Sequence, residues 1–213
     1  HLREAGITKP ILILGIVFDE YFPELVRYEI RPAVCEYEEA RKLSDEAVLQ
    51  KKTVHIHIAL DTGMTRIGFA DAQENVEEIK KISELPNLEI EGMFTHFCVS
   101  DEAEDGKDFT EKQYSCFSYV RDKLKESGFN IKICHCSNSG AIEDYEHTYC
   151  DMVRAGIILY GLAPSYKIQN NLNLIPAMTL KSTVLFVRTQ RTDICLSTVK
   201  KQKLWAEYVW TRL

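Results

Sequence analysis

Four polar side chains follow or interrupt strand-like apolar runs in this chain, and their chemistry suits an anionic ligand: Arg66, His96, Asn138 and Arg154. An arginine carries a permanent positive charge with several N–H donors, and a histidine can accept or donate a proton near neutral pH. The carboxyl ends of parallel strands meet at one rim of a barrel, where functional residues gather. We therefore expect these four side chains to lie close together at such a rim.

The stretch from Cys134 to Pro164 gives the clearest sign of a binding site. Asn138 and Ser139 open a segment of small residues that predicts a helix start, with either residue as the cap. Backbone amides at a helix N-terminus attract anions, and Gly156 lies beside the second apolar run of this stretch. Arg154 would then be a charge within an apolar strand, which requires a partner. The alternative is an ordinary turn and an arginine that extends into solvent.

Apolar and amphipathic segments alternate along the chain with short connections, which is typical of a parallel α/β domain. The expected strands are 10–15, 30–34, 53–60, 88–97, 131–136 and 152–159. The expected helices are 21–29, 36–50, 72–85 and 109–127, with a solvated loop over 102–108. An open doubly wound sheet and a barrel both fit this order. The phosphate-type site near the last two strands favours the barrel.

The segment 53–60 alternates strictly, so His55 and His57 share one face, which would line a barrel interior. The pair has no evident third ligand, and we predict no metal site. The next segment, 61–69, has two glycines around Arg66 and predicts a tight loop that returns this arginine over the barrel mouth. An ordinary loop with a solvent-exposed arginine is the alternative.

Composition narrows the class of protein. Hydrophobic residues make up 45% of the 213 residues, enough for a buried core, and the formal charge of −6 argues against nucleic acid as a partner. The seven cysteines are odd in number and have no paired spacing, which indicates reduced cytosolic thiols rather than a disulfide framework. No apolar run reaches membrane-spanning length. We expect a soluble cytoplasmic protein with no membrane partner.

Several motifs, in order along the chain, resemble those of the alanine racemase family. They are PILILG at 10–15, DTGMTRIG at 61–68, EGMFTHF at 91–97, HCSNSGA at 135–141, DMVRAGI at 151–157 and YGL at 160–162. The family fold is an eight-stranded α/β barrel of the TIM type that binds pyridoxal 5′-phosphate, followed by a β-domain. The resemblance implies a partial barrel over residues 1–178, lacking its first two strands, and the start of the β-domain over 179–213.

The resemblance also implies which residues hold the cofactor. Asn138, Ser139 and the backbone at Gly156 and Ile157 would hold its phosphate. Arg154 would donate to the pyridine nitrogen. Because an arginine does not give up its proton, the nitrogen would stay unprotonated and less charge would be drawn into the ring.

Two further residues would act on the substrate side of the cofactor. The resemblance implies that His96 lies against the cofactor ring and supports the catalytic hydrogen bonds. Arg66 would contact the cofactor's phenolic oxygen and the substrate carboxylate, with Met64 beside it. These residues would serve the interconversion of L- and D-alanine through an imine of pyridoxal phosphate, which supplies D-alanine for peptidoglycan.

Neither family base is visible in this chain. The family uses the cofactor lysine at the first barrel strand and a tyrosine early in the β-domain, supplied by the partner subunit of a homodimer. His1–Gly6 reads as the last turn of a helix, and the tail at 189–213 departs from the family pattern. We therefore expect a partial chain with little or no activity alone. A serine racemase of the same family and a non-catalytic pyridoxal-phosphate-binding remnant are the alternatives.

Overall fold

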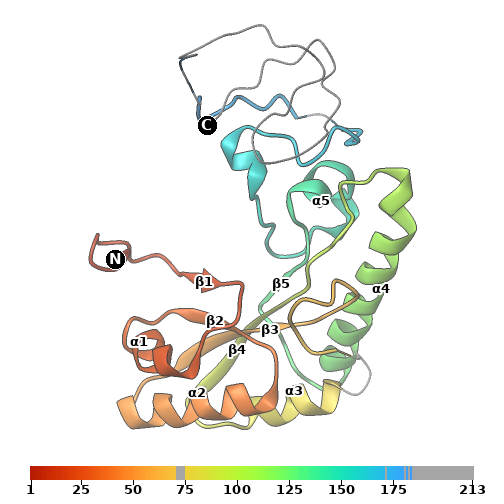
Figure 1. The fold of residues 1–213 in the computed structure, drawn as a ribbon. Helices are drawn as coiled ribbons and strands as arrows, with labels where there is room; N and C mark the ends of the chain where they lie inside the picture. The colour runs from red at the N-terminus through yellow and green to blue at the C-terminus, as the bar shows by residue number, and fades with distance from the viewer. Residues whose placement is uncertain (71–74, 171, 180, 182, 184–213) are drawn as a thin grey trace, which may run out of the picture. The chain divides into compact units, whose positions relative to one another are not determined.

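Five parallel strands form the central sheet of the chain (Figure 1). The computed structural model describes residues 1–70, 75–170, 172–179, 181 and 183. The strands are β1 (Leu12–Ile13), β2 (Arg31–Val34), β3 (Val54–Ala59), β4 (Leu88–Phe94) and β5 (Ile133–His135). They lie in the order β1-β2-β3-β4-β5, and every neighbouring pair is parallel. This strand order, with a crossover helix between every neighbouring pair, confirms the expected partial α/β barrel.

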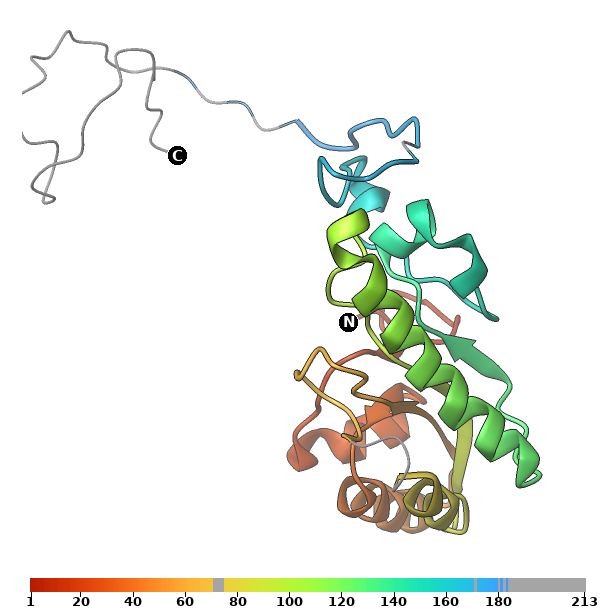
Figure 2. The same ribbon diagram turned by 90° about the vertical axis from the view of Figure 1, so that its right-hand side faces the viewer.

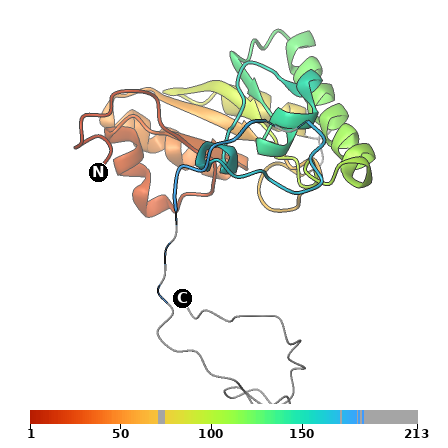
Figure 3. The same ribbon diagram turned by 90° about the horizontal axis from the view of Figure 1, so that it is seen from above.

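The strands are connected by the helices α1 (Phe22–Arg27), α2 (Tyr37–Gln50), α3 (Asn75–Ser83) and α4 (Glu104–Glu126), with the 3-10 turn η1 (Asp19–Tyr21) before α1. The last strand is followed by α5 (Ser139–Asp144) and by the 3-10 turns η2 (Glu146–Thr148) and η3 (Ile157–Tyr160). Figure 2 shows α4 running along one side of the sheet, and Figure 3 shows it at the opposite end from β1. The expected helices at 21–29, 36–50 and 109–127 are confirmed, and the expected helix at 72–85 is confirmed over its described residues.

Both faces of the sheet are buried near β3, as a barrel requires. Ile56 and Ile58 on its outer face are fully buried in the main core. The stripe Phe117, Val120 and Leu124 of α4 belongs to the same core, at the spacing of one helix face. The inner face carries polar side chains that interact with one another, described below.

The expected strand at 152–159 is wrong. Arg154 lies on an extended segment beside β5, where the backbone N–H of Asp151 bonds to Cys134 O and that of Arg154 bonds to Ser137 O. A regular ladder does not form, because the N–H of Cys134 bonds to the side-chain carboxylate of Asp151 at 2.8 Å instead of to a backbone carbonyl. The segment then turns into η3, so five strands rather than six are present among the described residues.

Two other boundaries differ from expectation. Residues 104–108 are the first turns of α4 rather than a solvated loop, and the buried Gly106 explains why. A side chain at this position would lie 2.0 Å from Val99 O, so the glycine lets the helix start pack directly against the preceding loop. The strand β4 ends at Phe94, earlier than expected, and His96 lies beyond it.

The strand β1 forms one edge of the described sheet, is only partly buried, and is shorter than the expected strand at 10–15. Leu14, Ile16 and Phe18, which follow it, are exposed. His1–Gly6 forms a hydrogen-bonded turn that ends at Gly6 with a positive φ of 83°. No helix in the described part of the chain is long and apolar enough to cross a membrane.

The chain divides into two compact units, His1–Pro176 and Ala177–Leu213. Most of the second unit lies outside the described residues, and so does the tail at 189–213. The start of a β-domain at residue 179 therefore stays a prediction.

Candidate active site

The loop after β3 is closed on itself and presents Arg66 at the strand's carboxyl end. Leu60 and Phe69 form a bridge across its base, and Asp61 Oδ1 accepts from the backbone N–H groups of Gly63 and Thr65, both at 2.9 Å. The Asp61 carboxylate thus holds the backbone of the turn in place by accepting two hydrogen bonds from it. The tight loop expected from the sequence is confirmed.

A buried glutamine on α4 holds this loop against the loop after β4. Gln113 Nε2 donates to Thr62 Oγ1 at 3.2 Å and to His96 O at 3.1 Å, and its Oε1 accepts from Cys98 N at 3.1 Å. Thr62 Oγ1 also lies 2.8 Å from Thr95 Oγ1. The helix therefore fixes the backbone from which His96 projects.

The guanidinium of Arg154 connects the ends of β4 and β5. Its Nη2 donates to Thr95 O at 2.7 Å and to Cys136 O at 3.0 Å, and its Nη1 donates to His135 O at 3.0 Å. Nη1 also lies 2.7 Å from His135 Nδ1, and Nη2 lies 3.3 Å from His96 Nδ1. Carbonyl oxygens and histidine nitrogens, rather than a carboxylate, are the partners that this buried charge needs.

A chain of hydrogen bonds continues from Arg154 across the inner face of the sheet. His135 Nε2 lies 2.8 Å from His57 Nδ1, and His57 Nε2 lies 3.5 Å from Glu91 Oε2, whose carboxylate pairs with Arg31. Because an arginine only donates, His135 Nδ1 must be an acceptor, and its Nε2–H donates to His57 Nδ1. His57 Nε2–H then donates to Glu91, so both histidines are neutral with the proton on Nε2.

The pKa values of His57, His96 and His135 agree with neutral rings. Burial, then the charges of Arg154 and Arg66, lower the pKa of His96 to about 4. Burial and Arg154 also lower the pKa of His135, and burial lowers that of His57. Burial in turn lowers the pKa of Arg154 to about 10, which leaves it charged at neutral pH.

These shifts predict a loss of stability on mild acidification. The unfolded chain binds protons at its histidines near pH 6.5, whereas the folded chain does not until the pH approaches the lowered pKa values. The contribution is fully present above pH 6.5 and declines as the pH falls towards 4. At pH 5 we expect a loss of about 2 kcal/mol for each histidine that stays neutral, measured as the free energy of urea unfolding.

Removing one of the three rings tests this pH dependence. His96→Gln should lessen the decline between pH 7 and pH 5, because one of the three groups that resist protonation is lost. A free energy of unfolding that is the same at pH 7 and pH 5 would contradict neutral buried rings.

The start of α5 carries the residues expected to bind phosphate. Asn138 is the N-cap, and its Oδ1 accepts from Ala141 N at 3.1 Å and from Ser100 Oγ at 2.7 Å. The expected helix start with Asn138 as cap is thus confirmed, while its side chain is occupied by these bonds. Ser139 Oγ accepts from the backbone N–H of Gly156 at 2.9 Å, which brings the two sequence segments together.

A small depression at the ends of β3 and β4 brings Met64, Arg66 and His96 together. Arg66 is exposed and, among the described residues, forms no ion pair or hydrogen bond. Ile157, the first residue of η3, is 43% exposed and directly follows Gly156. The side chains expected at one rim therefore lie in a contiguous set of contacts from Met64 through His96 and Arg154 to the α5 start.

Sequence reasoning missed the residues that support this set. His135 is the last residue of β5, and strand alternation alone could have placed it on the inner face with His57. His57 and His55 do not act as a pair, because His55 contacts Glu89, 3.4 Å away. Nothing in the sequence marks the carbonyls of Thr95 and Cys136 as partners of Arg154.

The fold defines a partial α/β barrel with a candidate ligand site at the carboxyl ends of its strands. The family model described as "Alanine racemase, N-terminal domain" matches residues 1–164. An alanine racemase of Clostridium perfringens is 43% identical over 211 residues, which are 96% of this chain and 54% of that protein. One of Methanococcus maripaludis is 44% identical over 208 residues, 95% of this chain and 55% of that protein. The chain belongs to the alanine racemase family, and it spans about half the length of these relatives.

Solved structures agree with the sequence comparison. The structure of alanine racemase from Clostridium difficile 630 superimposes with a TM-score of 0.79 at 43% identity, over 82% of this chain and 46% of that one. Alanine racemase from Bacillus anthracis with bound L-Ala-P superimposes with a TM-score of 0.72 at 35% identity, over 83% and 45%. A histidine racemase from Leuconostoc mesenteroides reaches 0.74 at 28% identity, over 83% and 46%. The same barrel therefore serves racemases of different amino acids.

Proposed function

We propose that this chain is part of an alanine racemase, an isomerase that interconverts L- and D-alanine with pyridoxal 5′-phosphate. The contact of Arg154 with His96, next to the unpaired Arg66, is the observation that carries the proposal. Relatives at 43% identity are named alanine racemases, which favours alanine over the serine alternative. The activity belongs to the whole protein, since the chain spans about half the length of those relatives.

The residues present fit pyridoxal phosphate. Both terminal nitrogens of Arg154 are engaged with protein atoms, and among the described residues none of these bonds uses its Nε–H. That N–H suits the pyridine nitrogen, which accepts a hydrogen bond. Gly156 lies at the phosphate end, where its backbone N–H donates to Ser139 Oγ at 2.9 Å beside the start of α5. The backbone of Ile157 follows it, and Asn138 orders the helix start.

The cofactor, when bound, supplies an electron sink for the electron pair left by removal of the substrate's α-proton. Arg154 keeps its own proton at neutral pH, with a pKa of about 10, and so donates a hydrogen bond without transferring charge. His96 stays neutral and accepts from Arg154 through Nδ1, which leaves its Nε2–H to orient a neighbouring group. Arg66, with Met64 beside it, binds the carboxylate of the amino acid.

The racemisation of alanine by the full-length protein tests the proposal. Arg66→Gln should lower kcat/KM about 100-fold, because a charge-assisted hydrogen bond to the substrate is lost. Arg41→Gln, at an exposed arginine of α2, is the matched control and should leave kcat/KM unchanged. D- and L-alanine are separated by chiral chromatography. Equal loss in both variants, or faster racemisation of serine than of alanine, would overturn the assignment.

Cofactor binding and activity of the 213-residue chain alone distinguish a pyridoxal-phosphate-binding fragment from a remnant that no longer binds the cofactor. We expect it to bind pyridoxal phosphate weakly, in competition with inorganic phosphate, and to form little or no D-alanine. Binding is followed by the absorbance of the cofactor. Measurable D-alanine formation would contradict its inactivity, and an absence of binding would favour a remnant that no longer holds the cofactor.

Three further features of the whole protein belong to the proposal. We propose a homodimer, a cytoplasmic location and a supply of D-alanine for the cell wall, as the resemblance implies. Light scattering of the full-length protein after size exclusion tests the dimer, and a monomer at working concentration would contradict it.

A further inference from the structure

A cluster of thiols lies on the face of β5 opposite the candidate active site. Cys134 and Cys136 are both buried and flank His135, so they point away from the inner face towards the main core. Cys136 Sγ lies 3.1 Å from Thr148 O, and Cys150 Sγ lies 3.6 Å from the same oxygen. The single S–H of Cys136 can donate either to this carbonyl or to Cys150 Sγ. The fold thus places two thiols, fourteen positions apart in the sequence, against one carbonyl.

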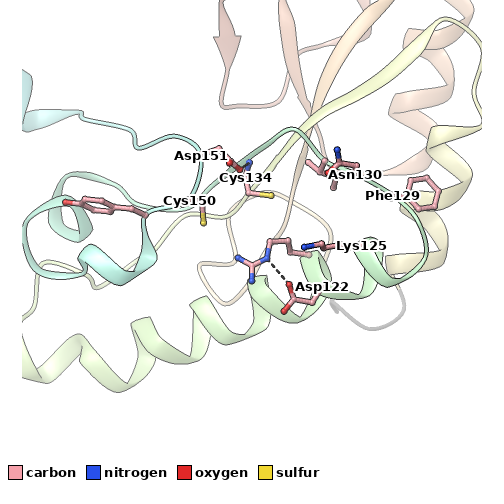
Figure 4. Close-up of a pocket in the computed structure, with 10 residues that line it drawn as sticks. Asp122, Lys125, Phe129, Asn130, Cys134, Cys150 and Asp151 are labelled. Carbon is pink, nitrogen blue, oxygen red and sulfur yellow. Dashed lines mark hydrogen bonds and ion pairs between the residues drawn. The ribbon is translucent and has the colours of Figure 1, made fainter.

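Cys150 opens onto a pocket of about 330 Å³ between β5 and α4. The lining includes Arg121 and Lys125 of α4 together with Cys134 and Asp151. Figure 4 shows the sulfur atoms of Cys134 and Cys150 on the side of the chain that faces α4. Cys150 is half-buried, whereas Cys136 behind it is fully buried. A small molecule in the pocket can therefore reach Cys150 first.

We propose that Cys150 and Cys136 form a dithiol site that reacts with low-molecular-weight disulfides, with Cys150 as the attacking thiol and Cys136 as the resolving thiol. The Cys150 thiolate attacks one sulfur of the small disulfide, the S–S bond breaks, and the first small thiol leaves after taking up a proton. Cys136 then loses its proton to solvent and attacks the Cys150 sulfur, which releases the second small thiol. Two protein thiols are oxidised and one small disulfide is reduced to two thiols.

The groups around each thiol indicate which of the two attacks and which resolves the mixed disulfide. The hydrogen bond from Cys136, followed by the charge of Arg121, lowers the pKa of Cys150, which favours its thiolate. The same hydrogen bond and burial raise the pKa of Cys136. Burial and Asp151 raise the pKa of Cys134 to about 11, so this third thiol stays protonated and takes no part.

The proposed disulfide would constrain the backbone segment that contains Arg154. The backbone N–H of Arg154 bonds to Ser137 O, and its Nη2 bonds to Cys136 O. A Cys136–Cys150 bond covalently joins the end of β5 to the residues just before this arginine. The proposal does not depend on the proposed function, because it concerns thiols outside the candidate active site.

Peptide mapping of the chain tests the proposal. The purified 213-residue chain is incubated with oxidised glutathione, its remaining thiols are alkylated, and it is cleaved after lysine, arginine and glutamate. Cleavage after Glu143 and Glu146 separates peptide 133–143 from peptide 147–154. We expect these two peptides to be joined by a disulfide, and the joined species to disappear on reduction.

Two matched variants identify the partner thiol. Cys134→Ser should keep the joined peptides, and Cys136→Ser should abolish them and leave glutathione attached to Cys150. Circular dichroism verifies that both variants are folded. Joined peptides that persist in Cys136→Ser, an unmodified Cys150 in the folded wild-type chain, or glutathione that stays on Cys150 of the wild-type chain without a joined peptide would each overturn the proposal.

Discussion

Replacing Arg154 with methionine should lower the free energy of unfolding by about 3 kcal/mol. Methionine fills a similar volume but donates no hydrogen bond. The carbonyls of Thr95, His135 and Cys136 would each lose a donor in a place that water does not readily reach. The cost of leaving three carbonyl groups without their donor is larger than the gain from no longer burying the charge of Arg154. Urea unfolding followed by circular dichroism measures the change.

The same substitution at an exposed arginine is the control. Arg41 lies on α2, where it pairs with Glu38 and Asp45 at the surface. Exposed ion pairs contribute little, so Arg41→Met should change the free energy of unfolding by less than about 1 kcal/mol. Similar losses in the two variants would show that the carbonyls around Arg154 are satisfied without it.

Replacing Gly92 with alanine should destabilise the chain by about 3 kcal/mol. Gly92 lies in β4 between His57 of β3 and Ile133 of β5. An added Cβ would lie 2.3 Å from His57 Nδ1 and 2.8 Å from Ile133 O. The His57 ring cannot move aside cheaply, because His135 holds it through Nδ1 and Glu91 lies against Nε2. Urea unfolding measures this change as well.

Two further measurements test whether crowding around an added Cβ causes the loss of stability in Gly92→Ala. One uses a glycine with open space around it, and the other uses a double variant. Gly15→Ala meets nothing within 4 Å and should change the free energy of unfolding by less than about 0.5 kcal/mol. In a double-mutant cycle, His57→Ala removes the ring, so Gly92→Ala should cost less in that background than in the wild-type chain. If Gly92→Ala lowers the free energy of unfolding equally in the wild-type chain and in His57→Ala, the His57 ring is not the cause, and the contact with Ile133 O is.

The crowding at Gly92 also explains why this residue was not recognised in the sequence. Within the motif Glu91–Phe97 a glycine in a strand signals a close approach, but it does not say of what. The approaching group, the His57 ring, comes from another strand and is held by a third. Only the register of β3 against β4, which shifts between Ile56 and His57, brings the two together.

The sequence by itself determined the alternation of strands and helices, the loop at 61–69, the cap at Asn138 and the four polar residues that follow strand-like runs. These features depend on local periodicity, on turn chemistry and on motifs, all of which are properties of adjacent residues. The family resemblance was carried by such motifs, and the match over residues 1–164 agrees with it.

The tertiary structure alone decided how Arg154 is held. Its segment was expected to be a strand, because Met152–Leu159 is apolar, but the Asp151 carboxylate takes the N–H that a ladder would use. The guanidinium then reaches carbonyls at the ends of two strands, and carbonyls carry no signal of their own in a sequence. Partners of this kind depend on where separate strands end in space, which residue types alone do not specify.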